Sequence, residues 1–411
     1  MSIEALESSE ILPQPVKPQW GLYGWDVYGH AVAHWQQGET FRQLPTPKLG
    51  INFASNDYLV LSQHPAVIQA AVEATQWFGV GSTGARLLSG NSAAVEHLEQ
   101  TIARCKGTEA ALVFNSGYQA NSSVLATLLD KTLLGTPPLV FFDKLNHASL
   151  YPAIAQSRAE LHRYPHPIDT AAGGKTSLDY LETLLEKHSN NSRPKVIVAE
   201  TVYGMDGDIT DVPRLVALAR ANNSALYLDE AHATGVLGPN GYGVTQGVDF
   251  QGVPTVILTT FSKGLGCFGA SVACSQAIKD LLINRCGGFI YTTALPPSVI
   301  ASVQATWELL PSLATERAHI QRLAQHLREG LHALGFSTGV SNSHIVPVIV
   351  GNSSRACHLR DIFMEQGVVV SVIRPPTVPH GTARLRFALN AQHTLPDIEA
   401  VLRTLQKETP C

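Results

Sequence analysis

Lys263 is the residue whose surroundings point most directly to covalent chemistry. It lies in residues 259–266, Thr-Thr-Phe-Ser-Lys-Gly-Leu-Gly, which overlap the end of the apolar run 255–260. Burial lowers the pKa of a lysine, and the neutral amine is then available to form a Schiff base with a carbonyl compound. The flanking glycines let the backbone approach a ligand closely. Most lysines are surface charges, so this pattern alone is a weak signal, and it indicates a covalent site only in combination with a carboxylate at the end of a neighbouring strand.

Asp229 supplies a carboxylate from a neighbouring segment. It ends the apolar run 225–229 and begins the sequence Asp-Glu-Ala-His, whose last residue is His232. An aspartate at such a position often caps a turn, whereas a carboxylate at a strand end can also face a bound cofactor. Because Lys263 follows the next apolar run, we favour the second interpretation.

Residues 115–121, Asn-Ser-Gly-Tyr-Gln-Ala-Asn, offer a place for a phosphate. They separate an apolar run from a helical pattern, and form either an ordinary turn or a helix start whose free N–H groups bind an anion. Thr260 can donate a further hydrogen bond. His147 follows another apolar run and is either structural or stacked on a flat ring. A lysine, a carboxylate for a ring nitrogen and a phosphate cradle are the parts that a pyridoxal-phosphate site requires.

The elements that must position these residues are apolar runs that alternate with helical patterns. The runs are continuously apolar, which is typical of strands covered on both faces. The alternation predicts an α/β fold with a mainly parallel sheet, which binds ligands outside the carboxyl ends of its strands. The predicted strands are 110–114, 139–143, 195–200, 225–229 and 255–260, with helices such as 177–187 and 211–221 between them.

Three regions are predicted along the chain. Residues 1–50 form an N-terminal arm, in which five prolines surround an aromatic-rich segment, 20–35, with little regular periodicity. Residues 51–297 form a large domain that carries the sheet and the cofactor, and residues 298–411 form a small C-terminal α/β domain. In the small domain the predicted helices are 298–334, 354–366 and 394–407, and the predicted strands are 345–350, 368–373 and 383–389.

Composition argues against several classes of protein. The 411 residues are 45% hydrophobic with a net charge of −4 and no basic cluster, which disfavours a nucleic-acid or membrane-surface binder. No apolar stretch reaches the ~18 residues that span a bilayer, and residues 1–19 lack the apolar core of a signal peptide. The six cysteines form no Cys-x-x-Cys pair, so we expect reduced thiols, no metal site and a cytoplasmic protein.

The motifs resemble those of the α-oxoamine synthases, a family of pyridoxal-phosphate enzymes with the fold-type I, aminotransferase-like architecture. The resemblance covers residues 51–407. Within this family the segment 374–386, which begins Arg-Pro-Pro-Thr, is most similar to the 8-amino-7-oxononanoate synthases of biotin synthesis. The other matching motifs are Asn56-Asp57-Tyr58-Leu59, Ser89-Gly90-Asn91, Ser116-Gly117-Tyr118, His147-Ala148-Ser149, Met205-Asp206-Gly207-Asp208, Asp229-Glu230-Ala231-His232, the lysine segment and residues 291–297.

The resemblance implies a role for each matching residue at the cofactor. Lys263 holds pyridoxal phosphate as a Schiff base and then carries the proton of the substrate α-carbon. Asp229 pairs with the pyridine nitrogen, His232 binds the phenolic oxygen, and His147 stacks on the ring. The phosphate is held by the backbone of Gly117 and Tyr118, the hydroxyl of Thr260, and Thr292 and Thr293 of a partner subunit, which predicts an obligate homodimer.

Three further residues are implied in substrate binding. Asn56 and Arg374 would hold the carboxylate of the amino acid, and Thr377 would lie along the acyl substrate. Gly204 departs from the family, which usually has a serine there that donates to the phenolic oxygen. Because such a hydrogen bond contributes about 0.5–1.5 kcal/mol, we expect Gly204→Ser to tighten cofactor binding or to shift the pKa of the bound cofactor.

The implied reaction is a decarboxylative condensation of L-alanine with a pimeloyl thioester, carried by coenzyme A or a carrier protein. Its products would be 8-amino-7-oxononanoate, CO2 and a free thiol. One alternative is the same chemistry on other substrates, as in aminoketobutyrate ligases, serine palmitoyltransferases or autoinducer synthases. The other is a non-catalytic homologue, and the presence of Lys263, Asp229 and His147 together argues against it.

Overall fold

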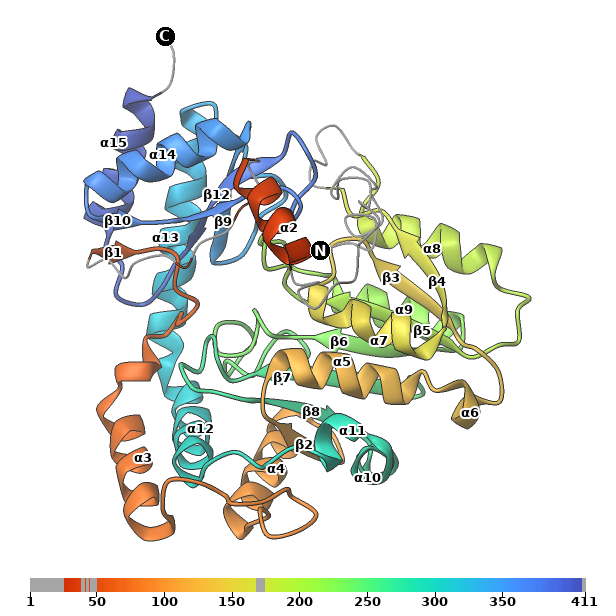
Figure 1. The fold of residues 1–411 in the computed structure, drawn as a ribbon. Helices are drawn as coiled ribbons and strands as arrows, with labels where there is room; N and C mark the ends of the chain where they lie inside the picture. The colour runs from red at the N-terminus through yellow and green to blue at the C-terminus, as the bar shows by residue number, and fades with distance from the viewer. Residues whose placement is uncertain (1–25, 38–40, 42–43, 45–49, 168–173, 409–411) are drawn as a thin grey trace.

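A seven-stranded sheet lies at the centre of the computed structural model, which describes residues 26–37, 41, 44, 50–167 and 174–408 (Figure 1). The strand order is β2-β8-β7-β6-β5-β3-β4. Neighbouring strands are parallel except around β8, which runs antiparallel to β2 and β7. The predicted α/β fold with a mainly parallel sheet is therefore confirmed. The strands are β2 (Ala110–Phe114), β3 (Leu139–Asp143), β4 (Glu160–Tyr164), β5 (Lys195–Glu200), β6 (Ser224–Asp229), β7 (Thr255–Thr260) and β8 (Ala270–Cys274).

Helices cover both faces of this sheet, which explains why its strands are continuously apolar. In β3, Val140 and Phe142 belong to an apolar cluster with α5 and α7, whereas Leu139 and Phe141 belong to a cluster with α8 and α9. All four side chains are fully buried, and each such burial stabilises the fold by roughly 1.5–3 kcal/mol. These helices are α5 (Gly117–Leu128), α7 (Tyr151–Ser157), α8 (Ser177–Lys187) and α9 (Val212–Ala221).

Two strands of the sheet, β4 and β8, lie outside the sequence prediction. β4 reads Glu-Leu-His-Arg-Tyr and forms the edge of the sheet, where polar side chains are tolerated and discourage pairing with another chain. β8 reads Ala-Ser-Val-Ala-Cys, and its small side chains give a weak apolar signal although every residue is buried. Both lack the three or more consecutive bulky apolar residues that each of the five predicted strands contains.

The parallel strands end together at one edge of the sheet, and this edge positions the chemistry-bearing residues. The register places Glu200, the last residue of β5, beside Asp229, the last residue of β6. Asp143 ends β3 and Thr260 ends β7. The loops that follow these strand ends carry His147, His232 and Lys263.

A second, antiparallel sheet lies in the C-terminal part of the chain, with the order β11-β12-β9. The predicted strand 368–373 is divided here: β10 (Val368–Val369) pairs in parallel with β1 (Ile51–Asn52), and β11 (Ser371–Ile373) pairs with β12. The first residues after the arm thus pair with a C-terminal segment, and the domain boundaries stay predictions. The other elements of this part are β9 (Ile345–Gly351), β12 (Ala383–Ala388), α14 (Ser353–Glu365) and α15 (Leu395–Lys407).

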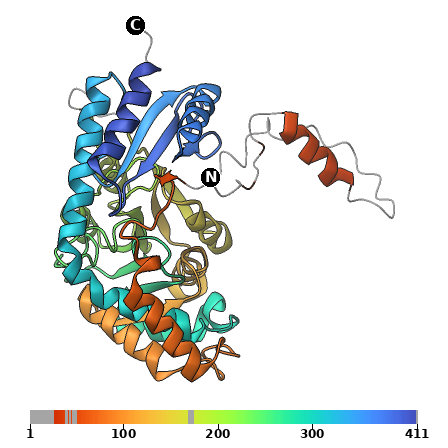
Figure 2. The ribbon, with the colours of Figure 1, turned by 90° about the vertical axis from the view of Figure 1, so that its left-hand side faces the viewer.

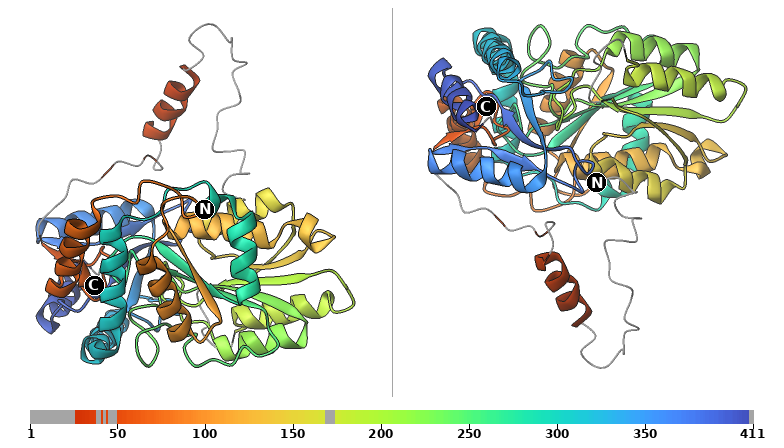
Figure 3. Two further views of the ribbon diagram at one scale, coloured as in Figure 1. Left: turned by 90° about the horizontal axis from the view of Figure 1, so that it is seen from below. Right: turned by 90° about the horizontal axis from the view of Figure 1, so that it is seen from above.

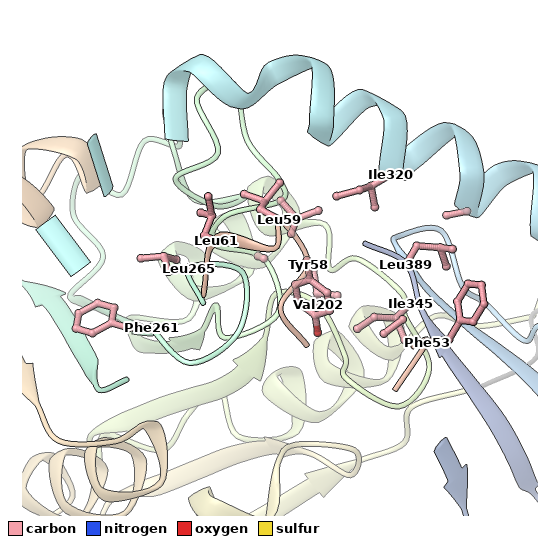
Figure 4. Close-up of a cluster of buried hydrophobic side chains, with 14 of the residues drawn as sticks. Phe53, Tyr58, Leu59, Leu61, Val202, Phe261, Leu265, Ile320, Ile345 and Leu389 are labelled. Carbon is pink, nitrogen blue, oxygen red and sulfur yellow. The ribbon is translucent and has the colours of Figure 1, made fainter. Parts of the chain in front are cut away.

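Helices α12 (Pro297–Leu309) and α13 (Ala314–Ala333) run one after the other toward the C-terminal sheet, as Figure 2 shows. The 3-10 turn η3 (Leu310–Leu313) interrupts the predicted helical stretch 298–334. An apolar cluster joins the two parts of the molecule, and it fixes the segment that contains Tyr58 against both. Figure 4 shows its members Phe53, Tyr58, Leu59, Leu61, Val202, Phe261, Leu265, Ile320, Ile345 and Leu389.

Helix α2 (Asp26–Gln37) corrects the prediction for the N-terminal arm, in which we expected little regular structure. Tyr28, Val32 and Trp35 recur at helical spacing, and all three side chains are exposed. Three apolar positions interrupted by Gly29 and two histidines are a weak periodic signal, which is why the sequence alone did not indicate a helix. Figures 2 and 3 show α2 apart from the rest of the ribbon.

The remaining helices of the described chain pack around the large sheet or on other helices, as α3 does on α12 (Figure 1). They are η1 (Leu61–Gln63), α3 (Pro65–Phe78), α4 (Ala93–Lys106), α6 (Lys131–Leu134), η2 (Ala148–Leu150), α10 (Gln276–Arg285) and α11 (Gly287–Ile290). Within the described ranges, no helix combines the length and the apolar character needed to cross a membrane.

Candidate active site

Lys263 lies in the loop after β7, with its amine beside His232. Nζ of Lys263 is 2.8 Å from Nε2 of His232, and the lysine is half-buried. Burial lowers the pKa of Lys263 to about 8, although the negative charge of Asp229 opposes this shift. A usable fraction of neutral amine is therefore present near neutral pH, as a nucleophile for an aldehyde requires.

His232 joins this lysine to a buried tyrosine. Its Nδ1 atom is 2.7 Å from the hydroxyl of Tyr58, so both ring nitrogens have partners. Burial, followed by the positive charges of Lys263 and Arg386, holds the pKa of His232 well below its usual value. The imidazole is therefore neutral, with one nitrogen that donates a hydrogen bond and one that accepts.

Asp229 is held in place by hydrogen bonds to both carboxylate oxygens. Oδ1 accepts from the backbone N–H of Ala231 at 2.9 Å, and Oδ2 accepts from Nδ2 of Asn121 at 2.7 Å. The hydroxyl of Tyr227 donates to Oδ1 of Asn121 at 3.0 Å, which fixes the orientation of that amide. A buried carboxylate with this support is suited to pairing with a protonated ring nitrogen.

Glu200 and His147 complete the edge of the sheet. Burial, and then the negative charge of Asp229, raise the pKa of Glu200 well above its usual value. The backbone of His147 donates a hydrogen bond to Glu200, and Nδ1 of His147 lies 2.7 Å from the hydroxyl of Ser149. The His147 side chain is exposed, which leaves a ring face open for stacking.

The start of α5 lies beside the end of β7. Gly117 is the first residue of α5, and a Cβ atom at this position would be 3.4 Å from Oγ1 of Thr260. The hydroxyls of Thr260 and Ser262 are 2.9 Å apart, and Tyr118 is exposed. The first N–H groups of a helix together with two hydroxyls form a cradle for a phosphate.

These groups fit pyridoxal phosphate. The cradle at Gly117 and Thr260 suits the phosphate, the carboxylate of Asp229 suits the pyridine nitrogen, and the amine of Lys263 suits the aldehyde. The arrangement brings together six of the residues that the sequence predicted for the cofactor, namely Gly117, His147, Asp229, His232, Thr260 and Lys263.

Thr292 and Thr293 lie close to the same helix start within a single chain. Oγ1 of Thr292 accepts a hydrogen bond from Nε2 of Gln119 at 2.8 Å, and the carbonyl of Thr293 accepts from Nδ2 of Asn115 at 2.7 Å. Thr293 is exposed. Their contact with the phosphate of a partner subunit stays a prediction.

Asn56 meets an arginine that the sequence reasoning did not single out. Oδ1 of Asn56 accepts from Nη2 of Arg386 at 3.1 Å, and Nε of Arg386 donates to the carbonyl of Gly204 at 2.5 Å. Arg386 is buried and, among the residues that the structure describes, has no carboxylate partner, whereas Arg384 on the same strand pairs with Asp206. A buried guanidinium without a counter-ion is suited to bind the carboxylate of a substrate.

Arg374 and Thr377 precede Arg386 in the chain and lie in the loop between β11 and β12. Arg374 borders a surface pocket with Cys357, His358 and Asp361 of α14. Thr377 is exposed, and its backbone N–H donates to the carbonyl of Arg374 at 3.0 Å. The structure therefore pairs Asn56 with Arg386 rather than with Arg374, and the predicted roles of Arg374 and Thr377 stay predictions.

Gly204 corrects one expectation. A Cβ atom at this position would be 2.4 Å from Nε2 of His232, a separation that real side chains do not show. The ring of His232 is buried and held on both nitrogens, so it cannot swing aside freely. The space that a serine would need is filled by His232, and Gly204→Ser would displace a cofactor ligand rather than add one.

The sequence analysis assigned no role to five residues of the site, although the positions of some of them in the sequence could have indicated one. Glu200 ends a predicted strand beside Asp229, which is the position that the sheet rule singles out. Arg384 and Arg386 alternate along a strand that is otherwise apolar, and charges in such a strand are seldom accidental. Tyr58, Asn121 and Ser149 lie in segments that the sequence analysis quoted, but they act through other side chains, so no sequence pattern indicated a role for them. The missed residues are Tyr58, Asn121, Ser149, Glu200 and Arg386.

Comparison with known proteins agrees with this geometry. Residues 48–405 match the family model described as aminotransferase class I and II. An 8-amino-7-oxononanoate synthase of Gluconacetobacter diazotrophicus is 46% identical over 361 residues, which cover 87% of each chain. The structure of a Sphingomonas wittichii serine palmitoyltransferase superposes with a TM-score of 0.81 at 28% identity, covering 94% of this chain and 98% of that one. For the 8-amino-7-oxononanoate synthase of Francisella tularensis the TM-score is 0.72 at 28% identity, with coverage of 87% and 97%.

Proposed function

Because the chain belongs to the aminotransferase class I and II family and is a pyridoxal-phosphate-dependent acyltransferase, we propose that it makes 8-amino-7-oxononanoate for biotin synthesis. The substrates would be L-alanine and a pimeloyl thioester, and the other products CO2 and the free thiol. The name and 46% identity of a relative that spans most of the chain support this choice. The observation that carries the amino-acid substrate is Arg386, a buried guanidinium without a carboxylate partner among the described residues, linked to Lys263 through Asn56, Tyr58 and His232.

The bound cofactor supplies an electron sink that stabilises negative charge on the α-carbon of the amino acid. Lys263 would hold the cofactor and, once released from it, would remove the α-proton. Asp229 would keep the ring nitrogen protonated, since an opposite charge beside that nitrogen favours its charged form. His147 would cover one face of the ring, and Glu200 accepts a hydrogen bond from the backbone of His147.

Arg386 and Asn56 would orient the amino acid. A carboxylate bound by the planar guanidinium is fixed in direction as well as in place, so the α-proton can face Lys263. This is positioning, which raises the rate by holding the reacting atoms together. Arg374 is the second candidate for this role, and the variants Arg386→Ala and Arg374→Ala separate the two. Replacement of the arginine that binds the carboxylate should raise the KM for alanine and leave the cofactor absorbance unchanged.

We propose further that the active site is shared within a homodimer. Exposed apolar side chains gather on the end of α3 and on the segment that follows it, and this segment contacts residues 291–294 through a hydrogen bond from Ala294 N to Gly84 O. An exposed apolar surface of this kind indicates a protein contact. Sedimentation should give a dimer, and a fully active monomer at assay concentration would contradict the shared site. The exposed residues are Trp77, Phe78, Val80, Leu87, Leu88 and Tyr291.

The second candidate function is the same condensation on other substrates, because the structural likeness to a serine palmitoyltransferase is at least as close as that to the synthase of Francisella tularensis. The test supplies alanine, glycine or serine with pimeloyl, acetyl, succinyl or palmitoyl thioesters and compares kcat/KM. Alanine with pimeloyl should lead. Glycine differs from alanine by one methyl group, worth about 1–3 kcal/mol in a pocket, and should be a slow alternative. A preference for serine with palmitoyl would move the protein to the sister group.

A further inference from the structure

Tyr58 occupies a position from which it can control the cofactor site without touching the reacting atoms. Its ring is fully buried in the apolar cluster of Figure 4. The ring of His344 packs edge-on against it, with the centroids 4.2 Å apart, and the backbone N–H of Ala391 donates to its carbonyl. The hydroxyl is therefore held at one point, between two possible acceptors. It lies 2.7 Å from Nδ1 of His232 and 3.1 Å from Oδ1 of Asn56.

The direction of every hydrogen bond in this chain of groups is fixed by its two ends. At one end the ammonium form of Lys263 can only donate, so Nε2 of His232 must accept. At the other end Arg386 can only donate, so the atom of Asn56 that it contacts is the amide oxygen, which accepts. Nδ1 of His232 then carries the ring proton and donates to Tyr58, and the hydroxyl of Tyr58 donates to Asn56.

Loading of the cofactor would reverse this order at the lysine end. With Lys263 bound to the cofactor aldehyde, its ammonium would no longer face Nε2. The phenolic oxygen of the cofactor is an acceptor, and a contact with His232 requires a proton on Nε2. Nδ1 must then accept, and the hydroxyl of Tyr58 is the donor within reach. The lysine releases its extra proton to solvent, while His232 and Tyr58 each keep one proton and change only its position.

We propose that Tyr58 is a positioning residue whose hydroxyl turns between Asn56 and His232 and so sets the tautomer of His232 that the cofactor meets. In the free protein it accepts from His232 and donates to Asn56, and in the loaded protein it donates to His232. The proposal extends the proposed function, but it depends only on the cofactor and not on the identity of the amino acid or the acyl group.

Two properties of the surrounding groups favour a switch of this kind. Burial raises the pKa of Tyr58 to about 12, so the hydroxyl keeps its proton throughout. The ionisable groups that act on His232 are Lys263, Arg386, His344 and His147, and with burial they keep its ring neutral. A neutral ring has a single proton, and its place is therefore decided by the neighbours.

The first test reads the position of that proton directly. Protein with nitrogen-15 histidine is prepared free of cofactor and loaded with pyridoxal phosphate, and the ring nitrogens are observed by NMR, with His232→Asn used to identify the signals of His232. We expect the proton on Nδ1 in the free protein and on Nε2 in the loaded protein. The same nitrogen protonated in both states would overturn the proposal. No variant of Tyr58 is needed for this result.

The second test removes the hydroxyl with Tyr58→Phe and uses Tyr164→Phe as the matched control. Tyr164 is also fully buried, and its hydroxyl has no hydrogen-bond partner within the described chain. Tyr58→Phe should bind pyridoxal phosphate about tenfold more weakly, on the scale of one buried hydrogen bond, and should shift the pH midpoint of the visible band of the cofactor. Tyr164→Phe should change neither. Wild-type affinity and midpoint in Tyr58→Phe would refute the role, and neither test involves a substrate, so an error in the proposed substrates leaves both results unchanged.

Discussion

Lys106, which is buried, and Lys263, which is half-buried, each contact a residue of the segment 230–232, but their hydrogen-bond partners differ. Lys106 forms an ion pair with Glu230 in which both side chains are fully buried, and it also donates to Oγ1 of Thr234 and to a backbone carbonyl. Lys263 lies beside His232, two residues from Glu230, and among the described residues its amine has a hydrogen-bond contact only with this neutral ring. The ammonium group of Lys106 is therefore saturated, with an acceptor for each of its three N–H donors, whereas that of Lys263 is not.

We propose that this difference separates a structural lysine, Lys106, from a reactive one, Lys263. Glu230 also accepts hydrogen bonds from the backbone and the hydroxyl of Thr245, at 2.9 and 2.8 Å, so the pair fixes the loop that follows β6. Asp229, the last residue of β6, directly precedes Glu230, and His232 lies two residues after Glu230 in the loop. The Lys106–Glu230 pair therefore fixes the loop against which Lys263 lies. We expect variants of Lys106 to lose stability and variants of Lys263 to lose activity.

Replacing the reactive lysine should have the largest effect on activity. Lys263→Ala removes both the covalent holder of the cofactor and the base for the α-proton, so turnover should be lost while weak, non-covalent cofactor binding remains. The measurement is product formation together with the visible spectrum. Lys407→Ala, an exposed lysine on α15, serves as the control and should be normal. Residual turnover above background in Lys263→Ala would contradict the assignment.

Asp229→Asn should lower the rate by at least ~100-fold, the scale of a positioned acid–base group. It should also act on Lys263. The pKa of Lys263 is lowered to about 8 by burial, and Asp229 opposes that shift, so the loss of this negative charge should lower the pKa further. Capture of pyridoxal phosphate by the free protein requires the neutral amine, and its rate should rise with pH through about 8 in the wild type. In Asp229→Asn the rise should occur at lower pH, and an unchanged midpoint would refute the coupling.

Lys106→Met should damage stability instead of chemistry. It leaves the carboxylate of Glu230 buried without its counter-ion, and breaking a buried pair in this way destabilises by about 3–5 kcal/mol. Urea unfolding measures the effect. Arg403→Met, which breaks an exposed pair with Glu399 at 3.6 Å, should change stability by less than about 1 kcal/mol. If both variants changed the free energy of unfolding equally, the ion pair of Lys106 with Glu230 would not have the structural role assigned to it.

Gly204→Ser has the smallest expected effect, and its sign decides between two accounts. The steric contact belongs to the Cβ atom, so Gly204→Ala and Gly204→Ser should both push His232 aside and weaken cofactor binding. If the hydroxyl mattered instead, serine would tighten binding and alanine would not. Equilibrium dialysis of pyridoxal phosphate against the two variants separates these outcomes.

Sequence reasoning selected several residues that the structure brings together at one edge of the large sheet, because strand ends, a lysine among glycines and a helix start all leave a local pattern. Five strands of the large sheet were located to within a residue for the same reason. It did not identify Tyr58, Asn121 or Ser149, whose importance lies in which side chains they meet across more than a hundred residues or through a shared partner. Nor could it see that His232 fills the space beside Gly204, since that depends on packing between two loops.

The central claim, that Lys263 and not Lys106 is the reactive lysine, is tested most directly by borohydride reduction of the protein loaded with pyridoxal phosphate. Reduction fixes the cofactor to whichever lysine holds it, and peptide mapping by mass spectrometry identifies that residue. The account predicts one labelled peptide, which contains Lys263, and none in Lys263→Ala. Label on Lys106 or on any other lysine, or label that persists in Lys263→Ala, would contradict it.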